Sequence, residues 1–342
     1  MTAGAARTAE TGRDPRLGYQ FAALNAVISG FAVYVNNVGV RMFADSTLYT
    51  ALKNGVVAVA VVLPFLVSRS RRAELARLNG AQWSLLVLIA LVAGSLAYGV
   101  DFRGRQISTA TTAAVIGHAQ FLLVAALAAA FLGERFPRTV PVALAVLAAG
   151  LTLGVRVHDV RLDAGVPLLA AGTVLFAVGA VLIKVALRTV SVATVVAVKM
   201  ALGAALLFAY LAATGGLAAA AHLSRLQWGF VLVTGLILLA FTLTAVAGLR
   251  HASATGVAAI SAGAPIVTAA LVATTRRLPI HAEQLLGFGL VLAALLTVYG
   301  VGAAEEGRTL TPAGRTPPRF GPAPSRRSRP RPSRGSDTAA YS

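Results

Sequence analysis

The sequence contains no cysteine, which excludes a disulfide framework and any metal site built on thiolates. Acidic residues are also scarce: 12 in 342 residues, all of them outside or at the edges of the long apolar runs. The five histidines lack metal-ligand spacing, and no serine or carboxylate sits in a nucleophile motif. The residues therefore predict no catalytic centre, no metal site and no cofactor.

Hydrophobic residues, by contrast, make up 57% of the chain, and they are gathered in ten runs joined by short connections. Most runs are long enough for a helix that crosses a hydrocarbon core of ~30 Å. The sequence therefore predicts an all-α polytopic membrane protein with ten transmembrane helices. The expected spans are 17–40, 46–67, 82–100, 108–132, 139–155, 164–187, 190–213, 227–249, 252–274 and 283–301.

One stretch of the chain occurs twice. The two copies are Ile107–Pro137 and Ala252–Pro279. Each copy has a basic residue just upstream, begins with a segment that contains Ser or Thr, continues with an apolar span, and ends with Arg, an apolar residue and Pro. The upstream residues, Arg105 and Arg250, are 145 positions apart, so the repeated unit is half of the protein. We expect repeat 1 over residues 17–157 and repeat 2 over residues 164–303. Five spans per repeat is an odd number, which predicts two halves with inverted orientation in the membrane.

The formal net charge of +18 comes from basic residues in short loops and in two tails, which is typical of juxtamembrane charge and not of nucleic-acid binding. Residues 1–16 form an expected disordered arm. Residues 304–342 are rich in Pro and Arg, which predicts a disordered tail. That tail either lies against anionic lipid headgroups or has no specific role.

Loop charge predicts the orientation. The arm, the loop Arg69–Arg77 and the pair Arg135 and Arg138 put nine basic residues on one side of the first half. By the positive-inside rule we expect a multi-pass membrane protein with both termini in the cytoplasm. The loop Thr214–Leu226 holds only Arg225, which agrees with an outer location and an inverted second half. Arg276 and Arg277, on the expected outer side, count against the inversion.

Polar residues inside the expected spans are the candidate binding residues, because lipid makes such residues costly. Their other interpretation is cross-helix hydrogen bonding that only stabilises the bundle. His118 and Gln120 are two positions apart, so only one of them can point squarely into a cavity. The candidates for substrate binding are Asn36, Asn37, Lys53, Tyr98, His118, Gln120, Lys199, Thr242 and Ser261.

The lysines are the most informative of these candidates. The chain has 27 arginines and three lysines, yet Lys53 and Lys199 lie inside spans, in the contexts TALKN and VAVKM. They are 146 residues apart, within one residue of the repeat offset. Snorkelling to the interface is one interpretation, but arginine snorkels equally well. We expect both lysines to face the interior and to pair with Asn36, Asn37 or an anionic part of the substrate.

Several runs resemble a known family: SGFAVYVNNVGV followed by YTALKN, and FLGER at the close of the fourth span. They are similar to the EamA family of the drug/metabolite transporter superfamily, over roughly residues 17–303. The resemblance implies an inner-membrane permease with inverted repeats and a central cavity. Two departures stand out. First, the second copy has Thr-Arg-Arg where the first has Gly133 and Glu134. Second, Gln120 occupies a position in the fourth span where the family often has a helix-breaking proline, although the ninth span has that proline, Pro265.

Together with the resemblance, these observations predict a secondary transporter and not an enzyme. The resemblance implies that it moves small metabolites or drug-like solutes across the inner membrane by alternating access. The alternatives are a polytopic membrane enzyme or flippase acting on lipid-linked substrates, and a membrane scaffold without transport. The expected partners are a small-molecule substrate and the lipid bilayer, without nucleic acid, and a homodimer is left open.

Overall fold

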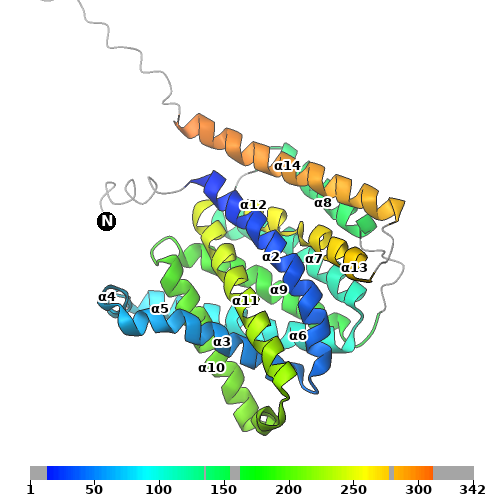
Figure 1. Ribbon diagram of the computed structural model, residues 1–342. Helices are drawn as coiled ribbons and strands as arrows, with labels where there is room; N and C mark the ends of the chain where they lie inside the picture. The colour runs from blue at the N-terminus through cyan, green and yellow to red at the C-terminus, as the bar shows by residue number, and fades with distance from the viewer. Residues whose placement is uncertain (1–13, 135, 155–161, 277–280, 311–342) are drawn as a thin grey trace, which may run out of the picture.

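The computed structural model describes residues 14–134, 136–154, 162–276 and 281–310. These residues form α-helices with a few π-helical and 3-10 segments, and no strand occurs among them (Figure 1). The predicted all-α fold is confirmed for this part of the chain.

The elements follow the expected spans in order. The first half contains α2 (Pro15–Met42), α3 (Ser46–Val67), α4 (Arg69–Ala76), α5 (Gly80–Ile89), η1 (Ala90–Leu96), α6 (Ala97–Ile107), α7 (Ala110–Leu127), η2 (Ala128–Leu132) and α8 (Thr139–Gly154). The second contains α9 (Val166–Ala186), α10 (Val192–Ala213), η4 (Gly216–His222), α11 (Arg225–His251), α12 (Ala254–Ser261), α13 (Ala264–Arg276) and α14 (Ala282–Leu310). The helices α5, η1 and α6 form one continuous span, Gly80–Ile107.

In the described residues, nine helices are long and apolar enough to cross a membrane. The expected fifth span is α8, whose 16 described residues rise about 24 Å, less than a hydrocarbon core of about 30 Å. The junction that follows, residues 155–161, lies outside the described residues. Within the described ranges there are thus nine helices long enough to span a membrane and one shorter apolar helix, where ten spans were expected.

Polar side chains fix where the helices begin. Asp14, Asp45 and Ser191 accept hydrogen bonds from backbone N–H groups in the first turns of α2, α3 and α10. Asn79 and Ser224 form capping boxes at the starts of α5 and α11. Such caps satisfy N–H groups that have no partner within the helix. They set the helix boundaries, and with them the depth of each side chain.

The helices of the two halves interlock. The main contacts join α2 to α11, α12 and α13, and they join α9 to α6 and α7. The helix α3 packs against α10 and α11, η1 packs against α10, and α8 packs against α14 (Figure 1). Each of these contacts joins a first-half helix to a second-half helix. A site near the centre is therefore built by both halves.

The direction of α2 follows from its contacts at two heights. Gly18 lies against Ala252, and the Gln227 side chain donates a hydrogen bond of 2.8 Å to the Met42 carbonyl. The start of α2 thus meets the end of α11, and its end meets the start of α11. The two helices are antiparallel.

The contacts of Gly80–Ile107 set the directions of α9 and α10. Its Gly104 lies against Leu169 and its Ala93 against Gly179, so α9 runs antiparallel to it. Its Gly94 lies against Gly203, and Gly99 faces Leu207 further along, so α10 runs parallel to it. Hairpin connections give α2 and Gly80–Ile107 the same direction. The first helices of the two halves, α2 and α9, therefore run in opposite directions.

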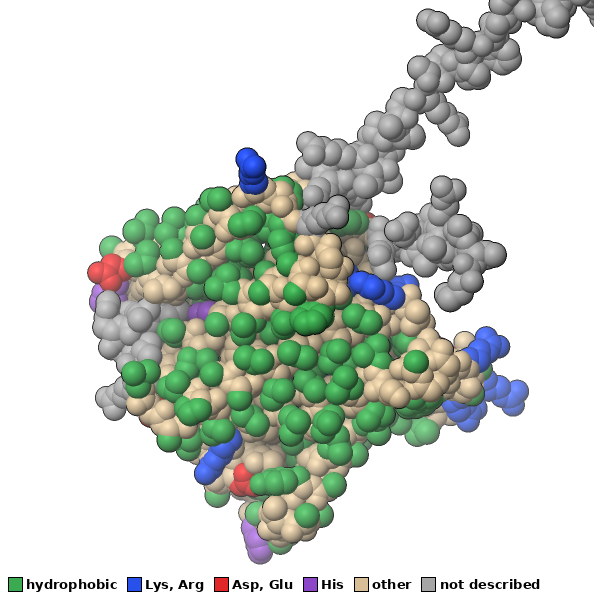
Figure 2. Space-filling view, turned by 180° about the vertical axis from the view of Figure 1, so that it is seen from behind, with side chains coloured by type: hydrophobic (Ala, Val, Ile, Leu, Met, Phe, Trp, Pro, Cys, Tyr) green, Lys and Arg blue, Asp and Glu red, His purple; other side chains and the backbone are tan. Residues whose placement is uncertain are grey.

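Large apolar side chains are exposed on the outer surface. Examples on α3, α11 and α14 are Val59, Leu66, Leu236, Leu286 and Leu296. Figure 2 shows apolar side chains spread over one face, with Lys and Arg side chains mainly near its edges. Water-soluble proteins rarely expose apolar patches of this extent, whereas a lipid-facing surface requires them.

Several expected boundaries were wrong. The third span ends at Ile107 and not at Val100, because the amphipathic residues after Val100 continue the helix. The helix α2 begins at Pro15, inside the expected arm, because Asp14 caps it. The helix α14 continues to Leu310, through the first seven residues of the expected disordered tail. Residues 1–13 and 311–342 lie outside the described residues.

The ninth span is broken where the sequence places its proline. The helix α12 ends at Ser261, and α13 begins at Ala264, one residue before Pro265. Proline has no N–H and its ring clashes with the carbonyl four residues earlier, which here belongs to Ser261. The fourth span, without proline, is unbroken from Ala110 to Leu132, with a π-helical last turn.

Candidate functional site

One face of α6 carries four residues that organise a buried polar cluster. Tyr98, Asp101, Phe102 and Arg105 are spaced i, i+3, i+4 and i+7, which places them on one side of a helix. The first three are buried and Arg105 is half-buried. Both interior lysines contact aromatic rings of this face.

Lys53 comes to the face from α3. Its side chain is 1% exposed, and Nζ lies 3.4 Å from the ring centroid of Phe102 and 5.1 Å from that of Tyr49. The ammonium donates a hydrogen bond of 3.3 Å to Asn36 Oδ1 on α2. The Tyr49 hydroxyl donates to the same oxygen at 2.8 Å. Lys53 is therefore enclosed by α2, α3 and α6.

Lys199 comes to the same face from α10. It is 6% exposed, and its Nζ lies 5.5 Å from the ring centroid of Tyr98. The Tyr98 ring meets Phe176 of α9 edge-on at 5.0 Å. Thr242 of α11 is buried and lies beside the Tyr98 hydroxyl, and its own hydroxyl has no hydrogen-bond partner of good geometry among the described residues. Lys199 and its neighbours thus come from three second-half helices and one first-half helix.

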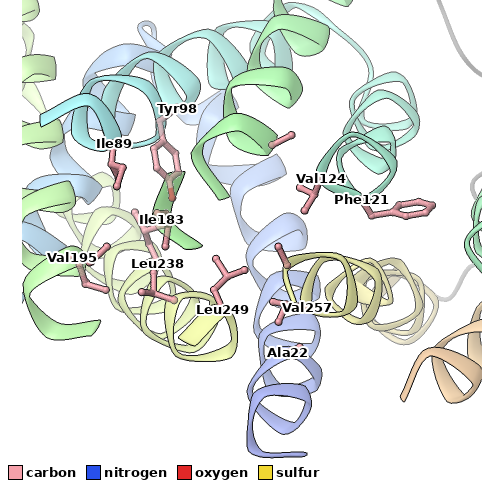
Figure 3. Close-up of a cluster of buried hydrophobic side chains, with 14 of the residues drawn as sticks. Ala22, Ile89, Tyr98, Phe121, Val124, Ile183, Val195, Leu238, Leu249 and Val257 are labelled. Carbon is pink, nitrogen blue, oxygen red and sulfur yellow. The ribbon is translucent and has the colours of Figure 1, made fainter. Parts of the chain in front are cut away.

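Apolar side chains also lie around Tyr98. Figure 3 shows its ring among Ile89, Ile183 and Leu238, which come from three different helices. All three side chains are buried. The aromatic ring under Lys199 is therefore held from several sides.

Asp101 and Arg105 form an ion pair within α6. Arg105 Nε lies 2.6 Å from Asp101 Oδ2, with a second contact of 3.4 Å to Oδ1. Both groups act electrostatically on Lys53, with opposite signs. The guanidinium also lies beside Gly117 and acts on His118 of α7. The expectation that every acidic residue lies at or beyond the span edges is wrong for Asp101, which is 4% exposed inside the longer helix.

The free-energy cost of burying the two lysine ammonium groups is only partly offset by their contacts. Burying an unpaired ammonium costs several kcal/mol. A desolvated cation–π contact contributes about 2 kcal/mol. The rings therefore offset only part of the cost of burying Lys53 and Lys199. Such a cost is a reason to seek a functional role for both side chains.

The other predicted site residues make no hydrogen bond to the lysines in the described part of the chain. Asn37, His118, Gln120 and Ser261 are half-buried, on α2, α7 and α12. The structure thus brings Asn36, Lys53, Tyr98, Lys199 and Thr242 to the α6 face, with His118 beside Arg105.

The third lysine also lies inside a helix. Lys184, in the last turn of α9, donates to the backbone carbonyls of Leu249 and Ala252 at the end of α11. Arg250 donates in return to the Leu187 carbonyl. Cations at a helix C-terminus stabilise its free carbonyl groups. Lys184 therefore joins α9 to α11, away from the α6 face.

Glu134 links the two halves at the same end of the bundle. Its carboxylate accepts hydrogen bonds from Ala254 N at 2.7 Å and Thr255 N at 3.2 Å, at the start of α12. Gly133 has a φ of 68°, which ends the fourth span and turns the chain towards α12. The Gly-Glu pair is thus a cap supplied by one half to a helix of the other.

Sequence reasoning missed Tyr49, Asp101, Phe102 and Arg105 as site residues. The helical spacing from Tyr98 to Arg105 could have signalled them. The prediction missed this pattern because it ended the third span at Val100 and so left Asp101, Phe102 and Arg105 outside the helix. Among the described residues, no group of three His, Asp or Glu side chains is placed to hold a metal ion.

The comparison with known families decides the class of protein. A sequence model of the EamA-like transporter family matches residues 16–156 and 163–300. The chain belongs to the EamA-like transporter family. Two matches to one family model also show that this family member contains two copies of the EamA unit. It is therefore a multi-pass membrane protein of a transporter family.

The fold of this EamA protein also occurs among solved structures. A crystal structure of a protein that carries no functional description matches it with a TM-score of 0.62 and 18% sequence identity. The match covers 85% of this chain and 98% of the other. At that identity the likeness shows the fold alone. No curated protein matches the chain.

Proposed function

We propose that this EamA protein is a secondary transporter of the inner membrane that moves small metabolites or drug-like solutes by alternating access. The observation that carries the proposal is the cluster on the α6 face. Its side chains come from α2, α3, α6, α9, α10 and α11, so both halves contribute to it. A site shared by two halves changes its access when the halves rock against each other.

The proposal includes two inverted five-span repeats, with α8 as the fifth span. The opposite directions of α2 and α9 support the inversion, and the interlocked pairs support an axis between the halves. It further includes both termini in the cytoplasm, as the loop arginines favour. No specific observation favours a membrane enzyme, a flippase or a scaffold.

Reconstitution tests the function. The purified full chain would be screened against a metabolite panel by thermal shift, and each stabilising solute would be tested for counterflow in proteoliposomes. We expect at least one such solute to accumulate inside the vesicles, and no accumulation with Lys53→Met at equal insertion. Solutes that bind but never cross the membrane would contradict a transporter and favour a scaffold.

Alternating access has its own test, because a chain without cysteine accepts spin labels at chosen sites. One pair, at Ala44 and Leu226, would report the end of the bundle where α2 finishes. The other, at Ala73 and Thr189, would report the opposite end. All four positions are exposed. We expect a transported solute to lengthen one distance and shorten the other; two distances that never change would contradict the mechanism.

A further inference from the structure

The charges around the α6 face do not balance. Three cationic side chains lie along this face: Lys53 at the Phe102 ring, Lys199 at the Tyr98 ring, and Arg105, which is paired with the carboxylate of Asp101. The described part of the chain holds no carboxylate within ion-pair distance of either lysine. With all groups ionised the cluster carries a net charge of +2. A low-dielectric interior makes such an excess costly and attracts an anion.

Asp101 is not free to neutralise the lysines. Arg105 already binds both of its oxygens, in contacts of 2.6 and 3.4 Å. An arginine fork satisfies a carboxylate better than the point charge of an ammonium does. The positive excess therefore belongs to Lys53 and Lys199.

The lysines also have hydrogen-bond capacity left. An ammonium carries three N–H donors, and Lys53 uses one of them, to Asn36. The Lys199 ammonium contacts the ring of Tyr98. Asn54, the next residue of α3, is fully buried, and both polar atoms of its side chain have no partner among the described residues, but it points to another side of the helix than Lys53. Buried polar groups are normally paired, so the remaining donors of Lys53 and Lys199 point to a polar occupant.

The same face offers an apolar surface beside the charges. Phe102 and Tyr98 are four positions apart, so their Cβ atoms lie about 6 Å from each other. Each ring contacts one lysine, and Tyr49 and Phe176 extend the aromatic surface on either side. An occupant with only an inorganic anionic group would leave these rings unused.

We propose that the substrate is a small organic anion. Lys53 and Lys199 hold its anionic group, and Phe102 and Tyr98 contact its apolar body. This inference rests on the proposed function, since it names the class of solute that the transporter carries. It also fits the use of lysine at these two positions in a chain with 27 arginines and three lysines: a compact ammonium on a flexible stem can follow an anion as the site changes access.

Matched sets of solutes test the charge preference directly. Benzoate, benzamide and benzylamine share one ring and differ in charge; succinate with succinamide, and phenyl phosphate with phenol, repeat the comparison for other anions. Binding to the purified full chain would be measured by calorimetry and by thermal shift. We expect at least one anion to bind at least tenfold more tightly than its neutral or cationic counterpart. Equal binding within every set, or no binding of any anion, would overturn the proposal.

Variants locate the site. Lys53→Met and Lys199→Met should each weaken binding of that anion at least tenfold, whereas Lys184→Met, which removes the remaining lysine, should leave its affinity unchanged. Retention of wild-type affinity in a Lys53→Met, Lys199→Met double variant would overturn the site. If a lysine variant fails to fold, the wild-type comparison of anion with neutral counterpart still decides the proposal.

The two proposals fail in different ways. Counterflow of a neutral or cationic solute that depends on Lys53 would refute the anionic substrate and leave the transporter standing. Lysine-dependent binding of anions without counterflow would refute the transporter and leave the anion site standing.

Discussion

Lys53 and Lys199 are equivalent by sequence position but not by environment. Lys53 lies close over Phe102 and bonds to Asn36, whereas Lys199 lies further from Tyr98. The shared feature is a ring of α6 under each ammonium. The two environments differ because both rings come from the same helix, α6. The end of α11, which corresponds to α6 in the second repeat, supplies no ring to either lysine.

Replacement of either lysine should remove transport. We expect Lys53→Met and Lys199→Met to lower the transport rate by about tenfold or more, equivalent to at least about 1.4 kcal/mol. Insertion should be unchanged, because methionine fills a similar volume and adds no unpaired charge. The rate would be measured in proteoliposomes at matched protein content.

Arginine at these positions is the stricter comparison. The larger planar guanidinium does not fit the space of a side chain that is 1% exposed and 3.4 Å from a ring centroid, so Lys53→Arg should also impair transport. Normal transport by both Lys53→Arg and Lys199→Arg would show that a snorkelling cation suffices at each position.

At the scale of elements, glycine allows the helices of the two halves to touch. A Cβ on Gly203 would lie 2.5 Å from the carbonyl oxygen of Gly94, and one on Gly287 would lie 2.6 Å from that of Gly150. These pairs join η1 to α10 and α8 to α14. Small residues permit close approach where lipid supplies no hydrophobic drive between helices.

We expect Gly203→Ala to separate η1 from α10 and to lower the melting temperature of the purified protein. The obstacle is the backbone of Gly94, which cannot rotate away as a side chain can. Gly289→Ala is the matched control: nothing lies within 4 Å of its added Cβ, and alanine favours a helix interior by about 1 kcal/mol. A Gly203→Ala protein as stable as the Gly289→Ala protein would show that the crossing tolerates a wider spacing.

At the scale of the whole molecule, orientation rests on charge. The exposed helix α4 carries Arg69, Arg71 and Arg72, whereas the equivalent connection in the second half is the short η4, without a basic residue other than His222. We therefore expect a cysteine at Ala219 to react with a membrane-impermeant maleimide in intact cells, and one at Ala73 to react only after the cells are opened. Reversed labelling would place the termini outside.

The tail is expected to be dispensable. The helix α14 continues to Leu310, so truncation after Leu310 keeps every described residue. Residues 311–342 are rich in Pro and Arg and poor in apolar side chains, so their loss removes little that can be buried. Insertion and counterflow should match those of the full chain. Lower counterflow at an equal membrane level would assign the tail a regulatory role.

The sequence by itself determined the class of fold. Long apolar runs have no stable conformation in lipid other than helices or closed barrels, and runs of this length favour helices. The doubled stretch, Ile107–Pro137 in its first copy, indicated two halves, and the family match shows them. The positions of Lys53 and Lys199 were also readable, because an intramembrane charge is rare enough to be noticed in one sequence.

The tertiary structure alone decided what these residues contact. The ring of Phe102 under Lys53 and the amide of Asn36 beside it come from other helices, and hydropathy carries no information on which faces of two helices meet. The role of Glu134 was hidden for the same reason, since its partner N–H groups lie 120 residues away. A span's length follows from local composition, whereas a binding site depends on how the helices are rotated about their axes, which only their mutual contacts determine.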